Sequence, residues 1–141
     1  MKGIVVDASV AATWVLEEEL SETGEWVLDQ MQAGVQAFVP ALWLLEMANL
    51  MFNAERRKRI DKVHRDDALE RIERLPVIII AAPSMADLKT LRMYAEKHQL
   101  TAYDAEYLRV AKELKLQLAT LDRNLIAAAR SEKVPVAQKS D

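Results

Sequence analysis

The strongest constraint on the fold is the alternation of short apolar runs with segments of helical character. Residues 4–6, 37–39, 77–80 and 117–120 read as strands, and each run is almost free of charge. Strands that are apolar throughout and separated by helices are typical of a parallel sheet covered on both faces. We therefore predict an α/β fold with three α/β/α layers and a central parallel sheet, formed by a single domain over residues 1–141.

The segments between the strands carry helix-capping residues. Ser9, Ser21, Asp61 and Ser84 are each placed to accept a backbone N–H in the first turn of a helix. The helices are expected at about residues 10–20, 21–34, 40–59, 61–75, 84–98, 103–111 and 122–130. Residues 134–136 are expected to form an edge strand, where a proline is tolerated.

Two of these helices have clear apolar positions. The side chains expected to face the core are Val63, Leu69 and Ile72 in the helix at 61–75, and Leu88, Leu91 and Tyr94 in the helix at 84–98.

Four acidic residues lie in unusually apolar surroundings. Asp7 ends the run 4–6 and Asp122 follows the run 116–121, while Glu46 is the only charge between residues 41 and 52. Asp104 opens the helical segment 103–111. A carboxylate in such surroundings costs several kcal/mol unless it is paired or bound to a metal. Four of them indicate a shared site for a hard divalent cation.

The predicted fold brings these acids to one rim of the sheet. Open parallel sheets bind ligands beyond the carboxyl ends of their strands, where Asp7 and Asp122 fall. Glu46 lies near the second turn of the helix that leaves strand two, and Asp104 lies in the first turn of another helix. Carboxylates alone bind Mg²⁺ or Mn²⁺. The expected chemistry is metal-assisted attack by water on a phosphodiester, with either one ion or two.

Three polar residues are candidates to support the acids. Ser9 lies two positions after Asp7, and its hydroxyl is placed to bind a metal water or an acid. Asn49 lies three positions after Glu46 on the same helical face, where it is expected to orient that glutamate. Thr120 lies two positions before Asp122 and shares its side of an extended strand.

The composition removes several kinds of chemistry. The absence of cysteine excludes disulfides, thiolate zinc sites and thiol nucleophiles. The two histidines, His64 and His98, lie in charged helical surroundings, which disfavours a two-histidine ribonuclease mechanism. The net charge of −3 argues against binding of nucleic acid by bulk charge. It does not exclude a nucleic-acid enzyme whose acids hold cations.

No membrane segment or signal peptide is expected. The longest charge-free stretch, residues 75–86, is too short to span a bilayer and contains two prolines. Asp7 and the acidic run 17–19 interrupt any N-terminal apolar segment. We expect a cytoplasmic protein without a membrane partner.

The acids and their supporting residues fall in four short motifs, Val6-Asp7-Ala8-Ser9, Glu46-x-x-Asn49, Tyr103-Asp104-Ala105 with Tyr107, Leu108 and Ala111, and Thr120-Leu121-Asp122 with Leu125. These motifs resemble those of PIN-domain ribonucleases, in particular VapC-type toxins of bacterial and archaeal toxin–antitoxin pairs. The resemblance implies that Asp7, Glu46, Asp104 and Asp122 are the catalytic and metal-binding acids, supported by Ser9, Asn49 and Thr120.

The same resemblance implies an activity and its partners. They are those of a Mg²⁺-dependent endoribonuclease, with Mn²⁺ as a substitute ion and structured tRNA or rRNA as substrate. The family is usually dimeric, so a homodimer is expected. A cognate VapB-type antitoxin is expected to neutralise the enzyme.

Simpler interpretations stay open for each acid. Asp7 and Asp122 suit plain helix N-caps, Asp104 suits any first helical turn, and Glu46 suits a buried ion pair with an arginine. The basic run 56–59 fits either an RNA-binding patch or a solvated helix end.

The tryptophans and the fold also leave alternatives. Trp14 and Trp43 are candidates for a partner groove, and Trp26 for the core. A signalling receiver would need a phosphoacceptor aspartate after residues 77–80, and this chain has none there. A haloacid-dehalogenase-type phosphatase would need a second acid two positions after Asp7, where this chain has Ser9. A catalytically silent PIN-like or receiver-like binding module remains the non-enzyme alternative.

Overall fold

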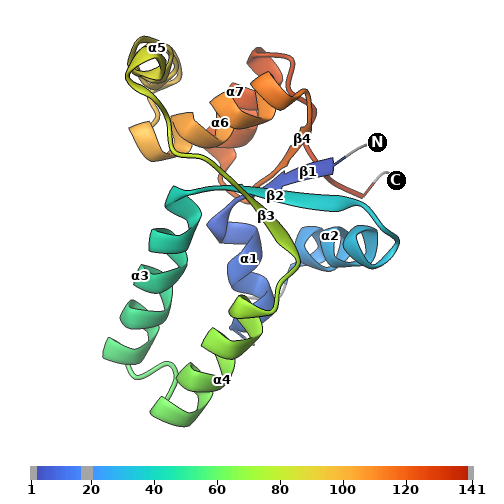
Figure 1. Ribbon diagram of the computed structural model, residues 1–141, viewed down its shortest axis with the longest axis vertical. Helices are drawn as coiled ribbons and strands as arrows, with labels where there is room; N and C mark the ends of the chain where they lie inside the picture. The colour runs from blue at the N-terminus through green and yellow to red at the C-terminus, as the bar shows by residue number, and fades with distance from the viewer. Residues whose placement is uncertain (1–2, 17–20, 140–141) are drawn as a thin grey trace.

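The computed structural model describes residues 3–16 and 21–139, which form helices on both sides of a parallel sheet (Figure 1). The sheet has four strands in the order β3-β2-β1-β4, and every neighbouring pair is parallel. The strands are β1 Gly3–Val6, β2 Gln36–Pro40, β3 Val77–Ile80 and β4 Gln117–Ala119. The predicted α/β/α architecture with a central parallel sheet is confirmed.

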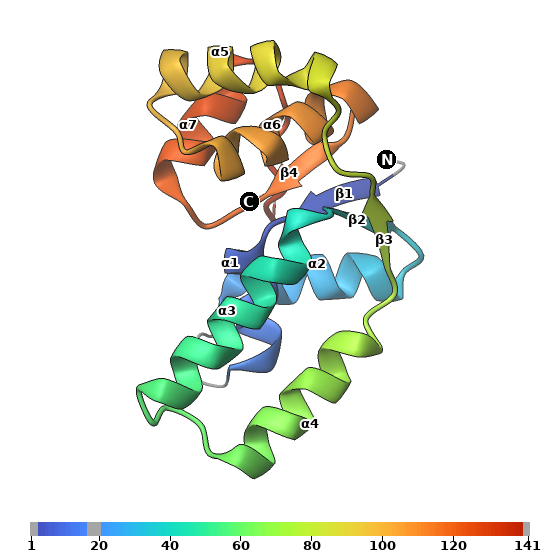
Figure 2. The same ribbon diagram turned by 60° about the vertical axis from the view of Figure 1, so that its left-hand side comes forward.

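The helices divide between the two faces of the sheet. Those on one face are α1 Ala8–Val15, α2 Glu22–Gln32, α3 Leu42–Arg56 and α4 Lys62–Glu73. Those on the other are α5 Leu88–His98, preceded by the 3₁₀ turn η2 Met85–Asp87, then α6 Ala102–Leu114 and α7 Arg123–Ser131 (Figures 1 and 2). None of the helices in the described ranges is both long and apolar enough to cross a membrane.

Most predicted caps are present, but one is wrong. Ser21 accepts from the Gly24 N–H, Asp61 accepts from the His64 N–H, and Ser84 forms a capping box with Asp87. The first helix begins at Ala8 and is capped by Asp7 rather than Ser9. A cap side chain must reach the backbone N–H three residues further on. Asp7, which directly follows β1, is placed to accept from the Val10 N–H. The predicted stretch 17–20 lies outside the described residues.

Two sets of predicted core positions are partly wrong. Val63 is 77% exposed because α4 packs against α3 and α1 in an arm that extends away from the sheet (Figure 2). Leu69 is also exposed, and Ala68 is the only buried residue of α4. Leu88 is exposed although Leu91 and Tyr94 are buried. Steps of three residues advance about 300° each around an α-helix, so Leu88 and Tyr94 lie roughly 120° apart on α5 and do not both face the core.

The two edges of the sheet differ from what the hydropathy of their residues predicts. β3 is an uninterrupted apolar run, yet it lies at the edge and leaves Ile79 50% exposed. At the opposite edge, Val136 forms a single parallel bridge with Leu118 instead of a strand. The predicted edge position of residues 134–136 is therefore right, but their pairing is shorter than a strand.

The tryptophans belong to the interior. Trp43 is buried, and Trp26 packs partly buried against the core, as predicted. The indole N–H of Trp14 donates to the Gly24 carbonyl at 3.0 Å, which ties α1 to α2. A Cβ atom at Gly24 would lie 2.1 Å from the Thr13 hydroxyl oxygen, so a larger residue there would force Thr13 to move. The groove interpretation is wrong for Trp43, and Trp14 is engaged with α2.

A compact ion-pair cluster joins α5, α6 and α7. Glu132, at the end of α7, accepts from Lys97 at 2.8 Å, Lys112 at 2.9 Å and His98 at 2.7 Å. Its side chain is 8% exposed. Hydrogen bonds from the two lysines lower the pKa of Glu132 from 4.5 to about 2.

Replacing Glu132 with glutamine should lower the free energy of unfolding by about 2 kcal/mol at neutral pH. A lowered acid pKa gives stability above the ordinary value of 4.5, which is lost as the pH falls toward about 2. The difference between wild type and variant, measured by urea denaturation, should therefore shrink over that window. Glu70→Gln is the control, since its pair with Arg74 is exposed and worth little. A difference that is constant with pH would contradict this assignment.

Candidate functional site

The four acids come from four different elements at one rim of the sheet. Asp7 directly follows β1, and Asp122 lies three residues after β4 and caps α7. Glu46 is in the second turn of α3, and Asp104 is in the first turn of α6. The parallel pairing of Val6 with Ala119 holds the carboxyl ends of β1 and β4 together. The sequence prediction of a common rim is therefore reproduced by the topology.

The acids interact electrostatically with one another. Burial raises the pKa of Asp7, which is 5% exposed, and the charge on Asp104 raises it further. Desolvation likewise raises the pKa of Glu46, with additional repulsion from Asp7 and Asp104. The pKa of Asp104 is raised by desolvation and by Asp122. The carboxylates therefore form a chain of mutually repelling groups.

No basic side chain offsets this charge within residues 3–16 and 21–139. None of the ion pairs in these ranges involves Asp7, Glu46, Asp104 or Asp122. The buried-ion-pair alternative for Glu46 thus lacks a partner among the described arginines. Desolvated carboxylates without a counterion cost free energy, which a bound cation would remove.

The described residues contain no preformed cage of metal ligands. In the part of the chain that the structure describes, no three acidic or histidine side chains are gathered closely enough to enclose a metal. Mg²⁺ normally keeps several waters and uses one or two protein carboxylates together with substrate phosphates. The donor set of carboxylates alone also suits Mg²⁺ or Mn²⁺.

Ser9 holds Asp7 in place, as its spacing suggested, whereas Thr120, predicted to lie on the side of Asp122, interacts with both acids. The Ser9 hydroxyl donates to Asp7 Oδ1 at 2.6 Å and accepts from the Leu121 N–H at 3.0 Å. The Thr120 hydroxyl oxygen accepts from the Asp122 N–H at 3.1 Å, and Thr120 also hydrogen-bonds Asp7. These two hydroxyls connect the segment after β1 to the segment after β4.

Glu46 is oriented by a residue that the sequence analysis did not single out for this role. The Tyr107 hydroxyl donates to Glu46 Oε1 at 2.6 Å, across 61 positions of sequence. Tyr107 is buried, and its pKa is raised by desolvation and by Glu46, so it keeps its proton. The available signal was its position three residues after Asp104, on the same side of α6. Asn49 makes no hydrogen bond to Glu46 among the described residues.

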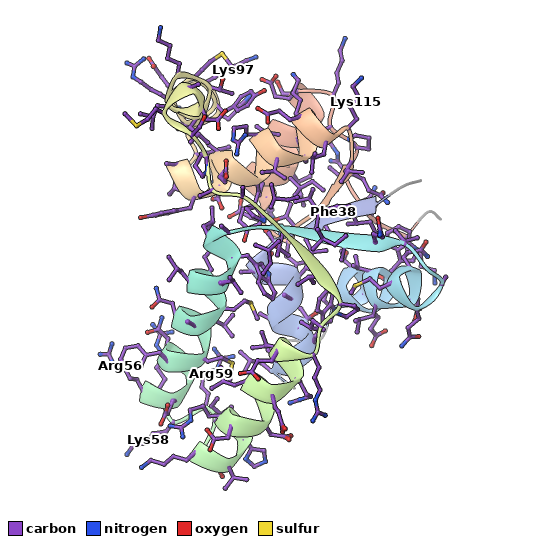
Figure 3. The ribbon with its side chains drawn as sticks, in the orientation of Figure 1. Phe38, Arg56, Lys58, Arg59, Lys97 and Lys115 are labelled. Carbon is purple, nitrogen blue, oxygen red and sulfur yellow. The ribbon has the colours of Figure 1, made fainter. Side chains whose placement is uncertain are left out.

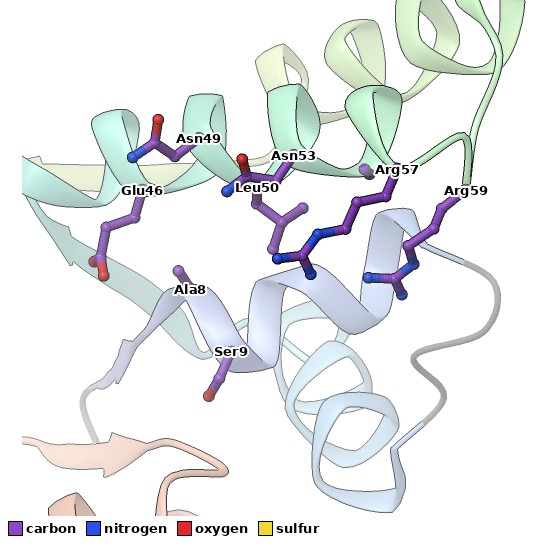
Figure 4. A pocket seen from close by; sticks show the side chains of 9 residues that line it. Ala8, Ser9, Glu46, Asn49, Leu50, Asn53, Arg57 and Arg59 are labelled. Atoms are coloured by element: carbon purple, nitrogen blue, oxygen red, sulfur yellow. The ribbon is translucent and has the colours of Figure 1, made fainter.

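An open pocket of about 380 Å³ begins at the acids and runs between α1 and α3 (Figure 4). Ser9 and Glu46 line one end, and Asn49 lines its wall. The complete lining is Ala8, Ser9, Glu46, Asn49, Leu50, Asn53, Ala54, Arg57 and Arg59. The pocket therefore connects the acidic rim with two arginines of the predicted basic run.

The histidines are engaged elsewhere. His64 Nδ1 lies 2.7 Å from Asp61 on α4, and His98 Nε2 lies 2.7 Å from Glu132. Neither contributes to the pKa shift of Asp7, Glu46 or Asp104. The arrangement at the rim is thus suited to binding a cation and a phosphate, and it lacks an imidazole base.

Comparison with known proteins is consistent with this geometry. The family model of the PIN domain matches residues 4–131. Ribonuclease VapC3 from Pyrobaculum aerophilum is 31% identical over 122 residues, which cover 86% of this chain and 91% of that protein.

Solved structures share the fold. PAE2754 from Pyrobaculum aerophilum has a TM-score of 0.62 and 22% identity, covering 89% of this chain and 84% of its own. FitAcB from Neisseria gonorrhoeae has a TM-score of 0.60 and 20% identity, covering 94% and 95%. FitAB bound to an IR36 DNA fragment has a TM-score of 0.62 and 20% identity, covering 94% and 92%. The extent of the family match and the similarity to a VapC ribonuclease lead to one conclusion: this chain belongs to the PIN-domain family.

Proposed function

We propose that this chain, as one nuclease domain over residues 1–141, is a Mg²⁺-dependent endoribonuclease of the VapC type. The observation that carries the proposal is the row of desolvated, mutually repelling carboxylates without a counterion among the described residues. The similarity to Ribonuclease VapC3 supports RNA as the substrate. A structured tRNA or rRNA in the cytoplasm is the proposed target.

In this proposal Asp7, Glu46, Asp104 and Asp122 hold Mg²⁺, with Mn²⁺ as a substitute. Such an ion, when bound, lowers the pKa of water and offsets charge on the scissile phosphate. Ser9 and Thr120 keep Asp7 oriented through their hydroxyls. Tyr107 fixes Oε1 of Glu46 and leaves Oε2 for the site. Asn49 lines the entrance beside Glu46.

We also propose two protein partners. A VapB-type antitoxin is supported by the similarity to a VapC protein, and by a structural neighbour, FitAB, solved on a DNA fragment. A homodimer is supported by the unpaired edge of β3 and the exposed apolar side chains near it, Ile79 at 50% and Met85 at 85%.

The alternative, a catalytically silent binding module, has less support. Such a module gains nothing from keeping several acids desolvated next to one another. The ribonuclease hypothesis and the binding-module hypothesis differ in whether the acids bind a divalent ion.

Asp7→Asn should stabilise the metal-free protein by about 1 kcal/mol and weaken Mn²⁺ binding at least about tenfold. The amide oxygen can still cap α1, while a desolvated charge is removed. Because the pKa of Asp7 is raised, wild-type stability should rise as the pH falls toward 3.8, and the variant should lose part of that slope. Denaturation curves and titration calorimetry measure the two effects.

Asp61→Asn is the matched control for this substitution. Asp61 is also an N-cap, but it is exposed and its pKa is lowered by hydrogen bonds to His64. This variant should gain no stability and should bind Mn²⁺ like the wild type. Unchanged Mn²⁺ affinity in Asp7→Asn would rule out the cation site.

The ends of the cut RNA test the chemistry. Hydrolysis by water should leave a 5′-phosphate and a 3′-hydroxyl, stop with EDTA and resume with Mg²⁺ or Mn²⁺. Attack by the RNA's own 2′-hydroxyl would leave a cyclic phosphate and needs a general base, usually a histidine. Cleavage should survive His64→Ala combined with His98→Ala, since both imidazoles pair with other acids. End-labelling that finds cyclic phosphates would contradict the mechanism.

Expression of the chain without its antitoxin should slow growth of its own host, and Asp7→Ala should abolish the effect. Asp61→Ala, matched in residue type and capping role, should remain toxic. Growth curves, with protein levels followed by immunoblot, provide the measurement. A folded and abundant wild-type chain that leaves growth unchanged would count against a toxin.

A further inference from the structure

The pocket between α1 and α3 changes from acidic to basic along its length. Glu46, Asn53 and Arg57 lie at positions i, i+7 and i+11 of α3 and its C-cap, which places them on one helical face. The separation of Glu46 and Arg57 corresponds to roughly 16 Å along the helix axis. Figure 4 shows the Arg57 and Arg59 side chains directed toward α1, at the end of the pocket away from Glu46.

The Arg57 guanidinium is available for a ligand. Its side chain makes no hydrogen bond or ion pair with any described residue, although its backbone N–H caps α3 through Asn53. Arg56 differs, because its guanidinium lies 5.4 Å from the Phe52 ring centroid and is not part of the pocket lining. Arg56 projects outward from the end of α3 (Figure 3).

Positive charge continues beyond Arg57. A second hollow of about 610 Å³ shares Arg59 with the first and is lined also by Lys58 and Arg71, with Asp61 as its single acid. A cationic track that leads away from an acidic site is the arrangement expected for a nucleic-acid backbone, which is bound by arginine and lysine.

We propose that Arg57 binds a phosphate of the substrate RNA a few nucleotides from the scissile phosphate, so that an unpaired strand lies along the α1–α3 pocket. A guanidinium matches phosphate oxygens with two parallel hydrogen bonds. The Asn53 amide, one helical turn before Arg57, is both donor and acceptor and can meet a ribose hydroxyl or a base edge. Leu50 supplies an apolar surface in the same pocket.

The geometry favours RNA over an acidic peptide as the occupant. The pocket shares Ser9 and Glu46 with the acidic rim, so a strand held at the acids has a direct path along α3. A peptide carboxylate near that end would face Glu46 and Asp7 without compensation. An RNA strand brings its phosphates to the cations proposed for the rim and continues to Arg57.

This inference rests on the proposed ribonuclease function, and the experiment separates the two. The probe is a fluorescein-labelled, unstructured RNA of about 12 nucleotides. Its binding is followed by anisotropy with Ca²⁺ in place of Mg²⁺, from about 50 to 200 mM salt. The proteins are wild type, Arg57→Ala, Arg57→Lys and the matched control Arg56→Ala. Mn²⁺ calorimetry on each confirms a folded protein with an intact acidic rim.

Arg57→Ala should weaken RNA binding about fivefold to tenfold and reduce the salt slope by about 0.7, irrespective of RNA sequence. Arg57→Lys should recover part of the affinity, and Arg56→Ala should match the wild type. With Mg²⁺, kcat/KM on the same RNA should fall in parallel for Arg57→Ala.

Other outcomes overturn the inference in distinguishable ways. A wild type that binds and cleaves RNA, with Arg57→Ala equal in affinity and salt slope, removes the Arg57 contact alone. A wild type that binds Mn²⁺ but neither binds nor cleaves this RNA, and that also leaves total tRNA and rRNA uncut, removes both proposals. An Arg57→Ala variant that cleaves normally but escapes its antitoxin would assign the pocket to that partner instead of RNA.

Discussion

The parallel pairing of β1 with β4 is the constraint on which the rest of the site depends. It sets Val6 beside Ala119, and the Asp7 N–H donates to the Ala119 carbonyl at 3.1 Å. The chain segments that leave the two strands are therefore held side by side. The Ser9 hydroxyl then spans them, between Asp7 Oδ1 and the Leu121 N–H. A shift of register by one residue would separate these groups, because successive residues of a strand face opposite sides of the sheet.

Helix capping and a functional role are compatible in these acids. Asp7 accepts from the Val10 N–H through Oδ1, and Asp122 accepts from the Leu125 N–H, also through Oδ1. Oδ2 takes no part in either cap. A single carboxylate can thus begin a helix with one oxygen and present the other at the rim, while the cap fixes its rotamer. The simpler interpretation of Asp7 and Asp122 as N-caps is therefore correct, and it is compatible with the proposed metal-binding role.

Sequence predicted what depends on local pattern and missed what depends on distant contacts. The strands followed from apolar runs, and the acids at the rim followed from the rule for parallel sheets, with Asp7 as the clearest case. The apolar run of β3 gave no sign of its edge position, because hydropathy does not report strand order. The bond from Tyr107 to Glu46 joins α6 to α3, and the spacing of Tyr107 from Asp104 indicated its side of α6 but not its partner.

The contrast between two groups of acids in the same fold bears on function. Glu132 accepts hydrogen bonds from two lysines and from the His98 ring, and its pKa is lowered to about 2. Asp7 and Asp104 have no ion pair within the described residues, and burial and neighbouring acids raise their pKa. The chain therefore neutralises an acid where only stability is at stake. It leaves negative charge uncompensated at the rim of the sheet, where a cation from solution can supply the missing charge and bring a phosphate with it.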